Sequence, residues 1–153
     1  MSDSTWNVIR ECNVTAIRKA SRRLTQIYDE ALRPVGLRAT QYSILAELTA
    51  NAGNPPTMRQ LADSLIMDRS ALGHAVRPLI RNELLALEES PADRRSRLIT
   101  VTPKGWDLFR RAQLSWQEVQ DQVAAAMGDE QAESLRTTLL AVAGNDRLLS
   151  MSG

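Results

Sequence analysis

The stretch from Thr57 to Gly105 constrains the fold most, because two short helical patterns are followed there by two short strand patterns. Thr57 starts the first helix with a capping box, in which its hydroxyl accepts from the amide of Gln60 and the Gln60 side chain reaches back. After a short turn at 66–67, Asp68 can cap a second helix that extends to about residue 82. This order predicts a helix-turn-helix.

A hairpin is expected after the two helices. The runs 84–89 and 97–101 contain leucine and β-branched residues and flank the loop SPADRRS, in which Pro91 and Asp93 mark a turn. Thr102 and Pro103 then begin a long helix, since threonine at the N-cap and proline at the first helical position are strong start signals. A helix-turn-helix followed by a two-stranded hairpin is a winged helix.

Helices are predicted on both sides of this block. Apolar residues recur every three or four positions from about Ser4 to Leu32, which indicates an amphipathic helix roughly 40 Å long. Thr40 is the expected N-cap of a further helix that ends near Ala50. After the block, helices are expected from Pro103 to Met127 and from Asp129 to about Leu149. The first apolar stripe is too long for a small domain to cover, so we expect it to pack against another chain.

The predicted fold class is therefore mainly α with a small β-hairpin, in a single domain over residues 1–153. Residues 40–105 form its winged helix-turn-helix lobe. Residues 4–36 and 106–150 form N- and C-terminal dimerisation helices.

The second helix of the pair has the chemistry of a DNA-reading helix, which fits the major groove and reads base edges from its solvent face. An arginine can bond bidentately to guanine, serine and histidine suit bases or phosphates, and a glycine allows close approach to the duplex. A surface arginine alone is usually a solvated residue, so the ordered combination of elements carries the interpretation. The residues predicted on this face are Arg69, Ser70, Gly73, His74 and Arg77.

The hairpin tip and the start of the first helix add positive charge. Arg94 and Arg95, with Arg97 following, suit a minor groove or its phosphate rims. Asp93 beside them can fix the direction of an arginine. Thr57 and Arg59, at a helix start, suit phosphate contacts. The sequence therefore predicts double-stranded DNA as a partner.

Composition argues against other classes of protein. One cysteine and one histidine leave no Cys-based metal cluster and few catalytic arrangements, and no Gly-rich phosphate loop is present. We therefore expect no enzyme, no catalytic residue, no metal and no cofactor. No apolar run approaches the roughly 18–20 residues of a membrane span, and the N-terminus does not resemble a signal peptide. A cytoplasmic protein without a membrane partner is expected.

The segment LIMDRSALGHAVRPLIRNELL, followed by PADRRSRLITVTPKG, resembles the MarR family of bacterial transcriptional regulators. The segment RPVGLRATQYSILAEL is similar to that family's approach to its DNA-binding lobe, and the resemblance covers about residue 8 to residue 149. It implies a homodimer whose two winged helices bind a pseudo-palindromic operator, as a repressor released by a small ligand or by oxidation. It places Ser70, Gly73, His74 and Arg77 on the recognition helix and Arg94 and Arg95 on the wing.

The same resemblance implies where an effector would bind. Family members that take small aromatic or phenolic ligands hold them between the dimer helices and the DNA lobe. That position would bring Lys19, Tyr42, Leu45 and Trp106 near the ligand.

Cys12 has two interpretations. It can be a small apolar residue in the stripe of the first helix. It can also be a thiol switch, as in the organic-peroxide-sensing branch of the family, which makes a redox-responsive repressor the alternative function. Tyr28 matches one of the tyrosines that support the cysteine in that branch, whereas Ala39 occupies the place of the other and Cys12 lies slightly upstream.

A winged helix used for protein–protein contact is an alternative of a different class. It would not require arginines at the hairpin tip.

Overall fold

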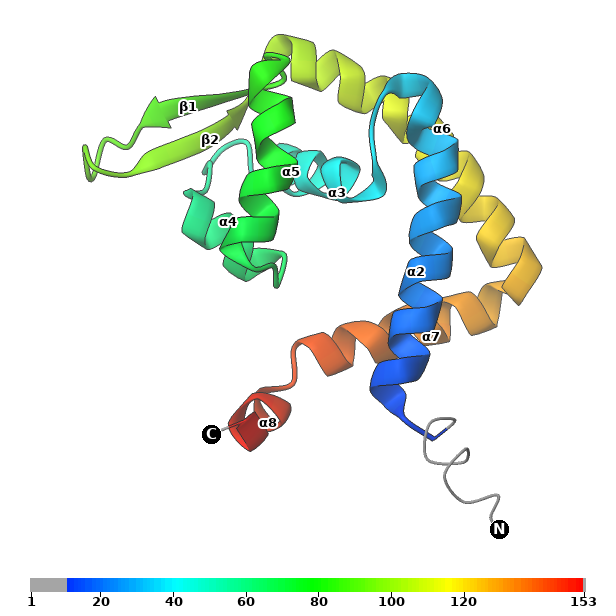
Figure 1. Cartoon of the computed structure of the whole chain (residues 1–153). Helices are drawn as coiled ribbons and strands as arrows, with labels where there is room; N and C mark the ends of the chain where they lie inside the picture. The colour runs from blue at the N-terminus through cyan, green and yellow to red at the C-terminus, as the bar shows by residue number, and fades with distance from the viewer. Residues whose placement is uncertain (1–10, 153) are drawn as a thin grey trace.

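The helices and strands follow the predicted order, with long helices on both sides of a helix-turn-helix and a hairpin. The computed structural model describes residues 11–152, with the side chains of residues 149 and 152 excepted. Within that range the fold is mainly α with one antiparallel two-stranded hairpin, which confirms the predicted fold class. The elements are α2 (Asn13–Leu32), η1 (Arg33–Val35), α3 (Ala39–Ala50), α4 (Met58–Ser64), α5 (Arg69–Arg81), β1 (Leu85–Glu89), β2 (Arg97–Val101), α6 (Pro103–Met127), α7 (Asp129–Ala143), α8 (Asp146–Leu149) and η2 (Ser150–Ser152) (Figure 1).

The hairpin is joined to the helix-turn-helix along its second strand. β1 and β2 pair from Leu85 opposite Val101 to Glu89 opposite Arg97. On the other edge of β2, the Ile99 amide donates to the carbonyl of Pro56 at 2.9 Å, just before α4 begins. The segment leading into α4 therefore holds the wing against the lobe, and the winged-helix arrangement is confirmed.

Three of the four helix starts predicted from capping residues, those at Thr57, Asp68 and Thr102, are present. The Thr57 hydroxyl accepts from the Gln60 amide at 3.3 Å, and the Gln60 side chain accepts from the Thr57 amide at 2.9 Å. The Asp68 carboxylate accepts from the amide of Ala71 at 3.1 Å. The Thr102 hydroxyl accepts from the amide of Gly105 at 3.0 Å. Each bond satisfies an amide that the first turn of a helix leaves without a partner.

The core lies between α3, α4, α5, the hairpin and the first half of α6. Aliphatic side chains that fill it from the lobe are among the most deeply buried in the described chain: Leu32, Ile44, Leu45, Leu48, Leu61, Leu72, Leu79, Leu85, Ile99 and Val76. α6 adds Leu108 and Ala112. Removing this apolar surface from water is the main stabilising contribution to the lobe.

The long helices extend from this lobe as an arm. α2 packs along α6, and Tyr28 contacts Trp116 with ring centroids 6.2 Å apart. Gly128, with φ of 90°, separates α6 from α7. α7 then turns back towards the N-terminal half of α2 (Figure 1).

The start of α3 differs from the prediction. The helix begins at Ala39, with Arg38 at the N-cap, and Thr40 does not cap it. The reason is a contact across ten residues, because the Asp29 carboxylate of α2 accepts from the Ala39 amide at 2.7 Å. A side chain from another helix therefore takes the capping role that the local sequence assigned to Thr40.

The outer helices also differ from the prediction. The expected last helix is divided, because α7 ends at Ala143 with Gly144 as its C-cap, and the Asn145 side chain accepts from the Arg147 amide at 3.0 Å to start α8. The expected first helix from Ser4 is described only from residue 11, and there it begins at Asn13. The part of that prediction before residue 11 lies outside the described residues.

Gly105 marks the closest approach between α6 and the wing. A Cβ atom at this position would lie 2.1 Å from the Leu84 carbonyl oxygen and 2.9 Å from a methyl group of Val101. We expect Gly105→Ala to lower the free energy of unfolding by about 2–3 kcal/mol, because the backbone of the wing must move away. Urea denaturation measures this change.

Gly53→Ala is the matched control, because a Cβ atom at Gly53 meets nothing within 4 Å. It should change the stability by less than about 0.5 kcal/mol. Equal stability of the two variants would contradict the close packing of α6 on the wing.

Candidate nucleic-acid interface

α5 turns one polar face outward and one apolar face into the core. Leu72, Val76 and Leu79 are buried, whereas the side chains of Ser70, His74 and Arg77 are exposed on the opposite side. The spacing of three and four residues brings these polar groups into one stripe along the helix. Arg69, in the first turn, is also exposed. The stripe therefore has the composition and the accessibility that base-edge contacts need.

Two further positions complete this stripe. A Cβ atom at Gly73 would meet nothing within 4 Å, so the packing of the chain itself does not require a glycine there. Arg81 is exposed one turn beyond Arg77 and continues the stripe. Arg81 was not among the predicted DNA-facing residues, although its spacing of four from Arg77 places it on the same stripe.

The wing tip is organised by Asp93. Its carboxylate accepts from the backbone amide of Arg95 at 2.9 Å and from the Ser96 hydroxyl at 3.0 Å. This turn leaves the side chains of Arg94 and Arg95 exposed at the end of the hairpin. Asp93 thus fixes the backbone that carries the arginines, through contacts to that backbone and to a neighbouring hydroxyl.

Three of the predicted DNA-facing residues have intramolecular partners. Arg59 lies 4.0 Å from Asp63, and Arg97 pairs with Glu89 across the hairpin at 3.2 Å. The Thr57 hydroxyl is used in the capping box. Surface ion pairs of this kind contribute little to stability, so the arginines can exchange these partners for phosphates at small cost.

The other arginines of the interface are exposed and have no acidic partner in the described chain. In the chain between residues 11 and 152, no carboxylate lies within 4.0 Å of Arg69, Arg77, Arg81, Arg94 or Arg95. The hairpin projects from the lobe beside α5, away from the arm of long helices (Figure 1). The structure thus brings a basic helix face and a basic hairpin tip onto the same lobe.

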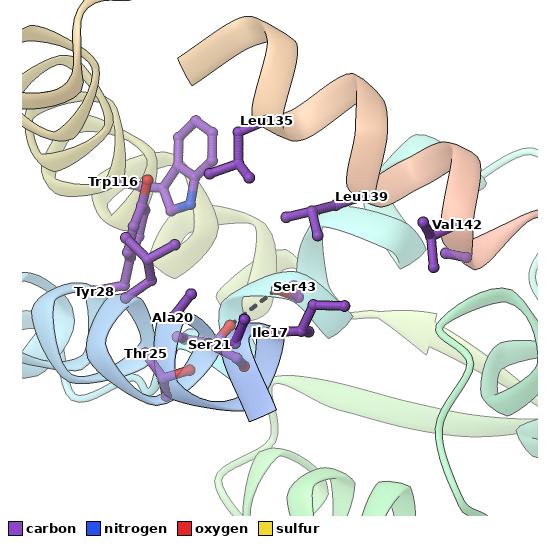
Figure 2. Close-up of a pocket in the computed structure, with 14 residues that line it drawn as sticks. Ile17, Ala20, Ser21, Thr25, Tyr28, Ser43, Trp116, Leu135, Leu139 and Val142 are labelled. Atoms are coloured by element: carbon purple, nitrogen blue, oxygen red, sulfur yellow. Dashed lines mark hydrogen bonds between the residues drawn. The ribbon is translucent and has the colours of Figure 1, made fainter. Parts of the chain in front are cut away.

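A separate cavity of about 730 Å³ lies beside the arm. Figure 2 shows Ile17, Ser21 and Thr25 on one side and Leu135, Leu139 and Val142 of α7 on the other, with Tyr28 and Trp116 near one end. Its lining is apolar apart from the indole N–H of Trp116 and the side-chain hydroxyl groups of Ser21, Thr25, Tyr28 and Ser43. Ser43 belongs to α3, so the cavity touches the lobe as well as the arm.

The residues expected to meet an effector do not line this cavity. Leu45 is fully buried in the lobe core, and Tyr42 stacks on Phe109 and Trp116 with centroids 5.4 Å from each. Trp106 makes an edge contact with Phe109, and Lys19 is exposed on α2. α3 turns Tyr42 and Leu45 into the core, whereas Ser43 between them reaches the cavity, so this cavity does not bring the expected residues together.

Cys12 lies at the N-cap of α2 and is partly exposed. The hydroxyl and backbone amide of Thr15 near the sulfur lower the pKa of the Cys12 thiol, which favours the thiolate. Burial raises the pKa of Tyr28, against the opposing charge of Arg136. The hydroxyl of Tyr28 donates to the side chain of Gln120 and stays protonated.

Metal sites and membrane spans are both absent from the described residues. No group of three or more His, Cys, Asp or Glu side chains there could hold a metal ion. Among the helices of the same part of the chain, none has the length and apolarity to cross a membrane.

Comparison with known proteins gives the same architecture. A model of the MarR family matches residues 35–96. The transcriptional repressor CouR of Rhodococcus jostii RHA1, bound to a 23-mer DNA duplex, is 25% identical, with a TM-score of 0.79 over 88% of this chain and 94% of its own. The M. tuberculosis transcriptional regulator MosR, in complex with DNA, is 32% identical, with a TM-score of 0.76 over 86% of this chain and 93% of its own.

Similarity in sequence extends to a curated relative. An HTH-type transcriptional regulator of Staphylococcus aureus strain Mu50 is 27% identical over 97 residues, which is 63% of this chain. The match spans 65% of the length of that relative.

The fold and the basic lobe define a winged-helix protein. The likeness to MosR over nearly its whole length, together with the family model, identifies the family more closely. The chain belongs to the MarR family, whose matched members are transcriptional regulators and not enzymes.

Proposed function

We propose that the protein is a homodimeric regulator that binds double-stranded DNA of pseudo-palindromic sequence and represses transcription. The α5 stripe reads base edges in the major groove, and the wing arginines hold the adjacent minor groove and its phosphates. Such a regulator acts on DNA in the cytoplasm. The observation that carries the proposal is the joint exposure of the α5 stripe and the wing tip, where Arg77, Arg94 and Arg95 have no carboxylate within 4.0 Å in the described chain.

The relatives support this reading of the surface. CouR is a repressor bound to a DNA duplex, and MosR is a regulator in complex with DNA. They cover 88% and 86% of this chain, respectively. Repression would follow if the bound dimer excludes the transcription machinery from its operator.

Apolar side chains on the arm support a second copy as the partner. Val14 on α2 is 59% exposed, and Leu140 on α7 is 66% exposed. Leu148 on α8 is 44% exposed. Apolar groups gathered on the helices that extend beyond the lobe are typical of an oligomer interface. Pairing these arms would set two lobes at a fixed spacing, as a symmetric operator requires.

The proposal is tested with duplexes selected from a random pool. Binding should fall steeply as salt rises, because each neutralised phosphate releases counterions.

Arg95→Ala should weaken binding to all sequences and reduce the salt slope by about one. Arg77→Ala and His74→Ala should cost about 1–3 kcal/mol on the preferred sequence and relax the preference itself. Fluorescence anisotropy against salt measures these changes, and sedimentation gives the stoichiometry, expected to be two chains per duplex.

Arg110→Ala is the control, because Arg110 is an exposed arginine of α6 that pairs with Asp107 at 2.8 Å. It should bind DNA as the wild type does. If no duplex binds in a salt-dependent way, the wing serves protein–protein contact and the DNA proposal is wrong.

We infer that the cavity beside the arm takes a small aromatic effector without a charged group. Its volume of about 730 Å³ is in the range of ligand sites, and its lining offers hydroxyls but no charged side chain. Ser43 of α3 and Leu139 of α7 both line it, so a ligand would contact the lobe and the arm together. If the ligand fits only one arrangement of the lobe and the arm, its binding shifts the protein towards that arrangement. The shift then changes the affinity of the protein for DNA.

Ala20→Phe should fill this cavity and abolish the release of DNA by neutral phenolic compounds. Release is measured by anisotropy while a panel of phenols and the matching carboxylates is added, and the neutral compounds should act at lower concentration. Ala125→Phe, on the exposed side of α6, is the control and should respond like the wild type. Equal responses of both variants would place the effector elsewhere.

The lowered pKa of Cys12 favours a second means of release, by oxidation of the thiol. We propose that peroxide converts the Cys12 thiolate to sulfenic acid, with the peroxide reduced to water or an alcohol. Because Cys12 is the N-cap of α2, its oxidation would alter the start of this arm helix.

Peroxide should therefore release DNA from the wild type and not from Cys12→Ser. Thr15→Val should slow the release at neutral pH, because loss of the Thr15 hydroxyl raises the pKa of the thiol and lowers the thiolate fraction. Release at equal rates from the wild type and Cys12→Ser would end the redox proposal. Iodoacetamide labelling against pH checks the shift in pKa independently of DNA.

A further inference from the structure

Two residues other than glycine have a left-handed backbone, Ile66 with φ of 50° and Glu83 with φ of 60°. Each ends a helix of the lobe in the same manner. After α4, the Met67 amide donates to the Ala62 carbonyl at 2.9 Å and the Ile66 amide donates to the Asp63 carbonyl at 3.2 Å. These two bonds form the helix-ending motif in which glycine is the usual residue at this position.

The turn after α5 repeats these bonds. The Leu84 amide donates to the Leu79 carbonyl at 2.9 Å, and the Glu83 amide donates to the Ile80 carbonyl at 2.9 Å. Glu83 also has further partners, because its carbonyl accepts from the Thr102 hydroxyl at 2.6 Å and its carboxylate lies 3.7 Å from Lys104. The two turns therefore have the same backbone conformation and hydrogen bonds, and they differ in the side chain at the left-handed position.

Ile66 is the less expected of the two residues. A β-branched side chain is strongly disfavoured in the left-handed region, where its branches crowd the backbone. Burial does not offset this strain, since the residue is 69% exposed. Its neighbours Leu65 and Met67 pack against the core, whereas Ile66 is absent from that packing. The fold of the lobe thus gives no reason for isoleucine at this position.

The position of Ile66 suggests what the side chain meets. It lies in the turn of the helix-turn-helix, two residues before the Asp68 cap and four before Ser70. In this motif the second helix enters the major groove by its N-terminal residues while the first helix crosses the DNA backbone. The turn between them therefore lies against the wall of the groove. Figure 1 shows it at the end of α5 that points away from α6.

We propose that Ile66 is a DNA-contacting residue that packs on an apolar group of the groove wall, a thymine C5-methyl group or the carbons of a deoxyribose. The inference rests on the proposed DNA binding of the lobe. Apolar side chains are the natural partners of the thymine methyl group, which is the apolar feature of the major groove. The contact removes from water a side chain that the free protein leaves exposed, and this gain offsets the strained backbone.

Ile66→Gly separates the two effects. It relieves the backbone strain, so the melting midpoint should rise by about 2–4 °C. It also removes the apolar contact, so affinity for the selected duplex should fall by about tenfold, which corresponds to about 1.4 kcal/mol. Ile66→Val keeps a β-branched apolar side chain and should bind within about twofold of the wild type.

Glu83→Gly is the matched control at the other left-handed position. It should also raise the melting midpoint, because it relieves the same backbone conformation, but it should leave DNA affinity unchanged. Replacement of single thymines by deoxyuridine in the duplex then distinguishes the two apolar partners. If one replacement weakens the wild type by several-fold and Ile66→Gly not at all, Ile66 contacts that thymine methyl group. If no replacement does so while Ile66→Gly still loses affinity and Ile66→Val does not, the partner is a deoxyribose.

Two results would overturn the inference. Ile66→Gly that binds DNA as tightly as the wild type would show that the exposed side chain does not meet the duplex. Equal losses of affinity in Ile66→Gly and Glu83→Gly would assign the effect to the backbone of the turns. Failure of the wild type to bind any duplex would instead refute the proposed function, together with this inference.

Discussion

The rest of the structure depends on the junction at Thr102, where the wing meets the long helix α6. The Thr102 amide donates to the Leu84 carbonyl at 3.1 Å, and its hydroxyl caps α6 at the Gly105 amide. The missing side chain of Gly105 lets α6 approach that same Leu84 carbonyl. The end of α5, the start of β1 and the start of α6 are therefore fixed at one place. Movement of the arm relative to the lobe must be transmitted through this junction or through α3.

α3 is the second connection between arm and lobe. Its buried side completes the lobe core, and Tyr42 stacks between Phe109 and Trp116 of α6. Its start is held by Asp29 of α2, and its Ser43 reaches the cavity beside α7. A molecule in the cavity would therefore press on a helix that packs directly against α5. This route gives the proposed effector and the proposed DNA-reading face a continuous physical link.

Features that depend on neighbours in sequence could be predicted, and features that depend on distant contacts could not. The caps at Thr57, Asp68 and Thr102 are local bonds between residues three apart, and all are present. The start of α3 depends on Asp29, ten residues away, and was placed at the wrong residue. The cavity combines four helices, so no sequence pattern could list its lining. The exposed stripe of α5 follows helical periodicity, and the same periodicity extends it to Arg81.

The stability of the lobe itself also points to a partner outside the chain. Gly73 lies inside α5, where glycine in place of alanine costs about 1 kcal/mol, yet a Cβ atom would meet nothing within 4 Å. No contact in the described chain therefore explains the glycine. The lobe has a well-filled aliphatic core that can support such a loss. A glycine on the polar side of α5 lets another surface approach the helix closely, and the arginines around Gly73 make the phosphate-lined groove of a duplex the surface that fits.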